Sequence, residues 1–319
     1  MTSTIPLYLD CDTGVDDAVA LAYLLGSPLV ELVGIGTVSG NTSAAQAARN
    51  TLDLLALDGR DDIPVAVGAH DHLARAYGGG AARVHGGNGI GGIEVPRAAR
   101  EPDPRTAVEL LLHLSHEHDG RLHVLTIGPA TNIALALRAD PTLVGRVASV
   151  TSMGGAALVP GNITPVAEAN IFNDAEAAAD LLAADWDVTL VPLDVTMEHT
   201  LTNADRERLL LSQRPLARVL GEMLDHYLDF YIPVYGDRTC ALHDPLAAIL
   251  AAGGLPPTRA PRVPVQVDST EGPGRGQTIV DLRGQRFSVR DHHDVRTRVV
   301  LDVDAPVTAH LMAALTGDD

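Results

Sequence analysis

Short apolar runs alternate with longer amphipathic stretches along most of this chain, and this pattern predicts strands that alternate with helices. Tyr8 and Leu9 lie in the first apolar run, a predicted buried strand, and residues 18–25 follow as an apolar helix. Further strands are expected at residues 30–38, 63–67, 122–127, 147–153 and 188–193, and further helices at 44–57, 106–118, 133–138 and 174–184. The alternation favours an α/β fold: one large domain over residues 1–319, with a doubly wound, Rossmann-like, mostly parallel sheet and helices on both faces.

Residues 68–104 interrupt the alternation, because they are rich in Gly, Arg and His and show little periodicity. A long irregular segment in a compact domain is usually functional or mobile. Within it, residues 84–92 (VHGGNGIGG) carry glycines that suit the hinges of a lid. We expect residues 76–92 to form a mobile lid.

A further helical pattern covers residues 209–235, with an interruption at Pro215. Tyr227, Tyr231 and Tyr235 are spaced four residues apart, so they share one face of this helix. That face either packs in the core or contacts a ligand.

Pro233 and Gly236 are expected to end this helix close before His243 and Asp244, which keeps both alternatives open for the two later tyrosines. Asp244 is expected to start another helix. The C-terminal part has strand-like runs at residues 278–282 and 298–303 and a last helix at 306–315.

Four carboxylates lie on the turn between the first strand and the first helix, those of Asp10, Asp12, Asp16 and Asp17. Anions this close repel one another unless they become protonated, face water or share a cation. Asp16 and Asp17 would also suit the positive end of the helix dipole, so an acidic helix cap is one interpretation. Asp10 and Asp12, however, stand at the carboxyl end of a strand, where open α/β sheets bind ligands. Oxygen ligands indicate Ca²⁺ or Mg²⁺.

Two known acidic motifs share part of this pattern. An EF-hand loop that began at Asp10 would need glycine and glutamate where Val15 and Leu21 stand, so it is excluded. The aspartyl-phosphate phosphatases carry Asp-x-Asp-Gly-Thr, with the first Asp as nucleophile, whereas Thr13 and Gly14 stand here in the opposite order. A Mg²⁺-dependent phosphatase that uses Asp10 stays open as a second function.

Charge and composition narrow the possible partners. The chain has 23 basic and 41 acidic residues and a net charge of −18, which argues against nucleic acid and anionic membranes. It contains no lysine, which excludes Walker A phosphate binding, Schiff-base chemistry and a pyridoxal cofactor. Cys11 and Cys240 are too few for a disulfide framework, and no stretch has the pattern of a signal peptide or a membrane span. We expect a cytoplasmic protein with a small-molecule substrate.

Seven polar segments lie at predicted strand ends or in the loops that follow them. They are Asp10-Cys-Asp-Thr-Gly-Val-Asp-Asp17, Gly40-Asn41, Gly128-Pro-Ala-Thr-Asn132, Met153-Gly-Gly155, Asn162, Glu168-Ala-Asn170 and His243-Asp-Pro245. In this order and spacing they resemble the calcium-dependent nucleoside hydrolases, the inosine-uridine-preferring nucleoside N-ribohydrolase family. The resemblance covers residues 7–250, and the residues after them add little to it.

The resemblance implies hydrolysis of ribonucleosides to free base and ribose with one Ca²⁺ per chain, bound by Asp12, Asp17, Asp244 and the backbone carbonyl of Ile127. An N-glycosidic bond breaks through an oxocarbenium-like ribosyl, so the reaction needs an activated water and a stabilised leaving group. Asp12 is implied as the base that accepts the proton of that water. Asp10 is expected behind the ligands, where it orients the turn.

The ribose hydroxyls are implied to contact Asp16, Asn41, Asn162, Glu168 and Asn170, and Met153 is implied to bind the substrate. Carboxylates and amides suit this task, since each hydroxyl both donates and accepts a hydrogen bond. Taken singly, the asparagines and Glu168 would be turn and cap residues, and only the joint pattern favours a sugar site.

His243 is informative for the subclass. Broad-specificity and pyrimidine-preferring members of the family carry His here as the leaving-group acid, whereas purine-specific members use aromatic stacking instead. His85 resembles a second histidine that the former members bring over the base, and the single Trp186 lies away from these motifs. We therefore expect broad or inosine/uridine specificity, with Tyr231 and Tyr235 as candidate base contacts. The loop before His243 looks shorter than in some relatives, which weakens the case for both tyrosines.

Relatives are mostly homotetramers or homodimers, so the resemblance also implies a homo-oligomer. A third possible function is a non-catalytic protein of the same fold that binds nucleosides or calcium. It is disfavoured because no expected ligand or ribose position is missing from the sequence.

Overall fold

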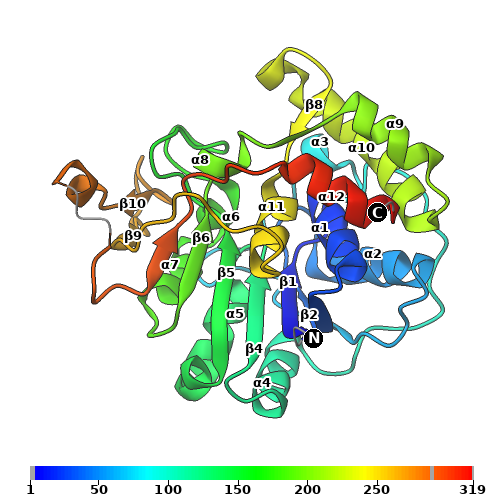
Figure 1. The fold of residues 1–319 in the computed structure, drawn as a ribbon. Coiled ribbons are helices and arrows are strands. Elements are labelled where there is room, and N and C mark those ends of the chain that lie inside the picture. The colour runs from blue at the N-terminus through cyan, green and yellow to red at the C-terminus, as the bar shows by residue number, and fades with distance from the viewer. Residues whose placement is uncertain (1–3, 288–290, 318–319) are drawn as a thin grey trace.

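Strands and helices alternate as the hydrophobic pattern predicts, and the strands form one central parallel sheet (Figure 1). The computed structural model describes residues 4–287 and 291–317. In this part of the chain the sheet has seven strands, in the order β11 (Thr297–Val299), β6 (Val188–Val191), β5 (Val147–Met153), β4 (Leu122–Thr126), β1 (Ile5–Cys11), β2 (Val30–Thr37) and β3 (Val65–Val67). All neighbouring strands are parallel, which confirms the predicted α/β domain.

The chain changes direction across the sheet at β1. Strands β1 to β3 run toward one edge, whereas β4 returns to the other side of β1 and the later strands continue to the opposite edge. Asp10 of β1 therefore pairs with Gly36 of β2 on one side and with Thr126 of β4 on the other. The carboxyl ends of β1 and β4 flank a topological switch point, where doubly wound sheets bind their ligands.

Alternate residues of β1 face two different cores, as the geometry of a strand requires. Leu7 and Leu9 face the first core and Tyr8 faces the second. The first core includes α1 (Val15–Gly26), α2 (Ala44–Leu57), α10 (Pro215–Tyr235), α11 (His243–Ala251) and α12 (Val307–Thr316), and the second includes α4 (Ala107–Glu117), α5 (Thr131–Ala139) and α7 (Ala175–Ala183). Helices thus cover both faces of the sheet (Figure 1).

Several short elements lie in stretches where the sequence predicted none, because three to five residues are too few to show a period. They are α3 (Ala82–His85), α6 (Ala169–Asn173), α8 (Leu193–Thr196), β7 (Thr200–Thr202), β8 (Thr239–Ala241), β9 (Val265–Val267) and the 3₁₀ helices Pro141–Gly145 and Arg283–Phe287. Helix α9 (Asn203–Leu211) begins earlier than expected, and β10 (Thr278–Val280) matches a predicted run. Strand β6 stops at Val191 because Pro192, which has no amide donor, follows it.

The long tyrosine-bearing helix is interrupted at Pro215 as predicted, since α10 starts there. The predicted break at Pro233 is wrong: α10 continues through it and ends at Gly236, whose φ of 82° is left-handed. Pro233 is exposed in the last turn, and Asp229, whose carbonyl loses its amide partner there, is exposed to water as well.

Cys11, at the end of β1, and Cys240, in β8, are both buried free thiols. Burial raises the pKa of each thiol well above its ordinary value. Among the described residues, no helix has the length and apolar character needed to cross a membrane.

Candidate active site

A cavity of about 370 Å³ opens at the switch point of the sheet. This is a typical size for a small-molecule site. Most of the predicted site residues line it: Asp16, Asn41, His85, Ile127, Met153, Asn162, Glu168, Asn170, Tyr231, His243 and Asp244. Asp12 and Asp17 are only 1% exposed and do not reach its lining, and neither does Tyr235.

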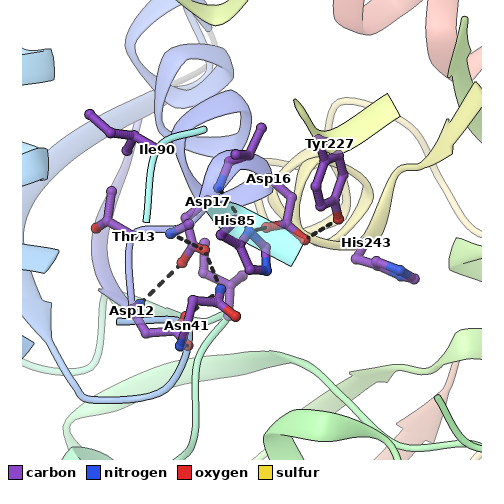
Figure 2. A network of polar contacts seen from close by, with 12 residues as sticks. Asp12, Thr13, Asp16, Asp17, Asn41, His85, Ile90, Tyr227 and His243 are labelled. Atoms are coloured by element: carbon purple, nitrogen blue, oxygen red, sulfur yellow. Dashed lines mark hydrogen bonds and ion pairs between the residues drawn. The ribbon is translucent and has the colours of Figure 1, made fainter. Parts of the chain in front are cut away.

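Asp17 holds the acidic turn together (Figure 2). Its Oδ1 accepts a hydrogen bond of 3.1 Å from the Asp12 amide, and its Oδ2 accepts one of 2.8 Å from the Gly14 amide. The side-chain amide of Asn41 also donates to Oδ2, at 3.0 Å. The turn that follows β1 is therefore fixed by a carboxylate on the first turn of α1.

Asp12 points toward the loop after β2. Its Oδ2 accepts a hydrogen bond of 2.6 Å from the Asn41 amide, and its Oδ1 accepts one of 3.3 Å from the Asn41 side chain. A β-carbon on Gly40 would clash with Asp12 Oδ2, so this approach requires glycine.

Asp16, Asp17 and Asp244 each offer a carboxylate oxygen, and these oxygens all lie within 4.8 Å of one another. Oδ2 of Asp16 accepts a hydrogen bond of 2.9 Å from the hydroxyl of Tyr227. Its Oδ1 is buried and has no hydrogen-bond partner within the described chain. An unpartnered buried oxygen beside two further carboxylates fits a hard cation, which prefers oxygen ligands.

Crowding and burial raise the pKa values of these carboxyls. Burial, and then the charge of Asp16, raises the pKa of Asp17 to about 7. The pKa of Asp12 is raised well above its ordinary value by burial and then by Asp17, and that of Asp244 by burial and then by Asp16. A bound cation would oppose both effects, because it favours the ionised form of each group.

Of the three clustered carboxylates, Asp17 and Asp244 were predicted as metal ligands and Asp16 was not. Asp16 stands in the cluster where Asp12 was expected, because Asp12 is turned toward Asn41. Ile127 lines the cavity, and its carbonyl accepts a hydrogen bond of 2.9 Å from the Asn170 side chain.

The predicted ribose residues after β5 are tied to one another through the backbone. Glu168 is the N-cap of α6, and its Oε2 also accepts a hydrogen bond of 3.0 Å from the Gly155 amide. The Asn170 side chain donates to the Met153 carbonyl at 3.2 Å. Asn162 accepts a backbone hydrogen bond of 3.0 Å through its Oδ1. These residues thus act as caps and turn residues and line the cavity as well.

His243 lies between two hydroxyl groups. Its Nδ1 is 2.8 Å from the Thr196 hydroxyl and its Nε2 is 2.7 Å from the Tyr231 hydroxyl. Burial lowers the pKa of His243 to about 4, so the ring is neutral near pH 7. The hydroxyl of Tyr235 instead donates to the Met197 carbonyl at 2.9 Å, away from the cavity lining.

His85 lies beside the N-terminus of α1 (Figure 2). Its Nδ1 accepts a hydrogen bond of 3.1 Å from the Val15 amide and lies 3.7 Å from Asp16 Oδ1. Burial lowers the pKa of this ring, so it is neutral and carries its proton on Nε2. His85 can therefore donate one hydrogen bond to a ligand.

The glycine-rich segment expected as a lid, residues 76–92, divides into two parts. In the first part, residues 76–81, a side chain added at Gly78 or Gly79 would meet no atom within 4 Å. In contrast, Asn88 accepts amide hydrogen bonds from Ile90 and Gly92, at 3.1 and 2.9 Å. The Asn50 side chain donates to the Asn88 carbonyl at 2.9 Å, which ties this second part to α2.

Sequence comparison decides which family this site belongs to. The profile described as inosine-uridine preferring nucleoside hydrolase matches residues 7–309. The chain belongs to this family. It is 36% identical to the probable uridine nucleosidase 2 of Arabidopsis thaliana, over 96% of this chain and 95% of that protein.

Solved structures agree with membership of the nucleoside hydrolase family. A plant nucleoside hydrolase superposes with a TM-score of 0.91 at 30% identity, covering 98% of this chain and 99% of that one. A purine-preferring ribonucleoside hydrolase from Gardnerella vaginalis gives a TM-score of 0.88 at 33% identity, covering 98% of each chain. This family member is an enzyme, a hydrolase that acts on N-glycosyl bonds.

Asp10 does not reach the cavity of this nucleoside hydrolase. It is completely buried, and its Oδ1 accepts a hydrogen bond of 2.8 Å from the Asn132 side chain. Burial raises its pKa to about 7. This position agrees with a residue that orients the turn, and it does not suit the nucleophile of a phosphatase.

Sequence reasoning missed part of the lining contributed by α10. Tyr227, Phe230 and Val234 line the cavity together with Tyr231. Their spacing of three, four and seven residues is the signal that was available, because such positions share a helix face. Thr196, which contacts His243, gave no signal, since it lies in the four-residue helix α8.

Proposed function

We propose that this hydrolase cleaves the N-glycosidic bond of ribonucleosides and releases free base and ribose. The observation that carries the proposal is a single cavity with two kinds of lining. Asp16 and Asp244 supply carboxylates for a cation and sugar hydroxyls, and His243 and Tyr231 supply groups that can hydrogen-bond a base.

We propose one Ca²⁺ per chain, held by Asp12, Asp17, Asp244 and the carbonyl of Ile127, with Asp16 beside it. The crowded carboxylates and the unpartnered Asp16 Oδ1 in the described structure support a cation here. When bound, the ion supplies Lewis-acid chemistry that orients a water molecule and makes it more acidic.

Asp12 is the proposed general base. Two hydrogen bonds from Asn41 fix the orientation of its carboxylate. A base held in one orientation lowers the entropic part of the barrier.

The remaining polar lining is proposed to bind the ribose through Asp16, Asn41, Asn162, Glu168 and Asn170, with Met153 as a further substrate contact. Asp16 and Glu168 are acidic, so they accept hydrogen bonds from sugar hydroxyls. The charge of Asp16 also favours the positive ribosyl that forms as the bond to the base breaks.

His243 is the proposed acid for the leaving group, with Tyr231 next to it. The free ring is neutral, so it must take up a proton from solvent before it can donate one. Negative charge that develops on the departing base favours this uptake, because it raises the pKa of a nearby imidazole, and the imidazolium then gives the proton to the base. Thr196 and Tyr231 hold both ring nitrogens, so the ring has a fixed orientation when the proton moves. His85 is proposed to contact the base through its Nε2 proton, and Tyr235 is retained only as a less favoured base contact.

We propose broad or inosine/uridine specificity, supported by His243 and by the family to which the chain belongs. We also propose a homo-oligomer, a tetramer or a dimer, on the basis of the resemblance. A cytoplasmic location is proposed because both thiols are free, as is usual in a reducing compartment.

A panel of ribonucleosides assayed for free ribose, with and without chelator, tests the proposal. Ribose release that chelator abolishes and Ca²⁺ restores, with about one calcium per chain by metal analysis, is the expected result. Nucleoside binding without ribose release would instead identify the non-catalytic alternative. Mg²⁺-dependent phosphate release from a phosphomonoester would identify the phosphatase.

A further inference from the structure

The C-terminal part of the chain reaches back to the loop that precedes Glu168. Strands β9 and β10 form an antiparallel hairpin beside α7 (Figure 1). Two adjacent residues of this hairpin contact the two ends of the 156–167 loop. Gln277 forms an antiparallel bridge with Ala167, and Thr278 contacts Ala156.

The Thr278 hydroxyl contacts both the backbone carbonyl and the backbone amide of Ala156. The Thr278 hydroxyl donates to the Ala156 carbonyl at 2.7 Å and accepts from the Ala156 amide at 2.9 Å. Thr278 is 4% exposed and Ala156 is 6% exposed, so water does not replace these bonds readily. A buried amide or carbonyl that loses its partner is costly, and the backbone shifts to avoid it.

The Ala156 peptide follows the residue that contacts Glu168. The amide of Gly155 donates to Glu168 Oε2 at 3.0 Å, and Gly155 has a left-handed φ of 84°. A β-carbon on Gly155 would lie 2.9 Å from the methyl group of Thr278, so the two residues are in close contact. Thr278 therefore helps to place the Gly155 amide, which holds the Glu168 carboxylate together with the amides of Asn170 and Ile171.

The hairpin is itself anchored to the core of the fold. The side chain of Arg275 is 3% exposed and forms two hydrogen bonds with Glu176 of α7, at 2.9 and 2.7 Å. It also donates to the Ser269 carbonyl at 2.7 Å. A paired guanidinium of this kind gives a rigid support.

We propose that Thr278 is a positioning residue for the ribose site. Through Thr278, the C-terminal hairpin helps to hold the Gly155 amide and thereby the side chain of Glu168 in place. The inference rests on the proposed function, because it requires Glu168 to bind the ribose. It gives the residues after α11 a part in substrate binding.

Thr278→Val tests this inference, because it keeps the shape of the side chain and removes both hydrogen bonds. Thr278→Ser keeps the hydroxyl. Thr308→Val is the matched control, because the Thr308 hydroxyl donates at 2.8 Å to the Thr200 carbonyl, outside the cavity. KM and kcat for inosine and uridine are measured by ribose release, together with the thermal midpoint of each variant.

The KM of Thr278→Val should rise about tenfold or more, with kcat within about threefold of the wild type, since ribose contacts act in the ground state and the transition state alike. Thr278→Ser and Thr308→Val should keep the KM of the wild type. If Thr278→Val does not fold, Thr278→Ala removes the same bonds without the extra methyl group and should show the same rise in KM.

An unchanged KM in the folded variant would overturn the inference. So would a loss of kcat alone that follows the fraction of folded protein, because it would give Thr278 a purely structural role. Wild-type protein that releases no ribose from any nucleoside would overturn the proposed function itself, which makes the two failures distinct.

Discussion

The hydroxyl of Tyr227 donates a hydrogen bond of 2.9 Å to Oδ2 of Asp16, and this contact joins α10 to the acidic turn (Figure 2). It leaves Asp16 Oδ1 as the oxygen without a hydrogen-bond partner in the described part of the chain. Tyr227 therefore orients Asp16 so that one oxygen stays available to a cation or a sugar hydroxyl.

Tyr227→Phe should lower kcat/KM for inosine and uridine about tenfold or more, because a hydrogen bond to a charged group contributes about 1.5–3 kcal/mol. Steady-state kinetics on the Ca²⁺-loaded enzyme measure this loss. Tyr23→Phe is the control: its hydroxyl contacts His310 at 2.9 Å, away from the cavity. Equal kinetics for Tyr227→Phe and the wild type would show that Asp16 needs no such partner.

Asp12→Asn should reduce kcat far more than it weakens substrate binding, because asparagine keeps an oxygen but is a poor base. Asp10→Asn should keep most of the activity, because Asp10 lies behind the turn and contacts Asn132. Single-turnover kinetics with metal-saturated variants separate these effects. A fatal Asp10→Asn beside an active Asp12→Asn would reverse the two roles.

His243→Ala should separate substrates by the protonation that their leaving groups need. On inosine or uridine we expect kcat to fall about 10²–10⁴-fold, the usual contribution of a general acid. On p-nitrophenyl riboside, whose leaving group is stable as an anion, the loss should be small. Equal losses on both substrates would mean that His243 positions the substrate or the metal. No loss on either would make it a structural residue.

Binding of a ribose-like inhibitor should slow amide hydrogen exchange in the glycine-rich segment, and mainly at residues 76–81. Residues 86–92 already have the hydrogen bonds of Asn88 and Asn50, so less protection remains to be gained there. Exchange followed by mass spectrometry with peptides on each side of residue 82 measures the difference. Exchange that does not change in either part would rule out lid closure.

Asp140→Asn should lower the free energy of unfolding near neutral pH but not in strong acid. Hydrogen bonds from Thr142 and Arg146 lower the pKa of Asp140 to about 2 in the folded protein. A lowered carboxyl pKa stabilises the fold above the unfolded value of about 4, and this contribution disappears as the pH falls toward 2. Urea titrations between pH 6 and pH 2 measure the change, with the exposed Asp119→Asn as control. A difference that stays constant with pH would contradict the assignment.

The order of strands and helices could be predicted because each apolar run is bounded by turn residues and has a clear period. Helix α2 matches residues 44–57 and β5 matches residues 147–153 as predicted. Elements such as α6 and α8 could not be predicted, since a single turn has no period. Helix α10 continues past Pro233 because water can replace the hydrogen bond that proline removes at this exposed turn. A local sequence pattern does not reveal that exposure.

The sequence predicted which residues belong to the site more fully than it predicted which way their side chains point. The motifs identified most of the residues that line the cavity, because they lie at strand ends that meet at the switch point. They could not show that Asp16, rather than Asp12, joins Asp17 and Asp244 in the cluster of carboxylate oxygens, because Asn41 decides the direction of Asp12. Helical spacing likewise placed Tyr235 beside Tyr231 but could not show that only one of them faces the cavity.

The two shielded thiols make this enzyme convenient for spectroscopy. Cys11 and Cys240 are buried with raised pKa values, so neither forms the thiolate that maleimide reagents attack. A cysteine introduced at Gly78, where a side chain meets open space, would be the one site that takes up a fluorophore in the folded protein. The emission of that dye would then report the surroundings of residues 76–81 during turnover, without removal of either native cysteine.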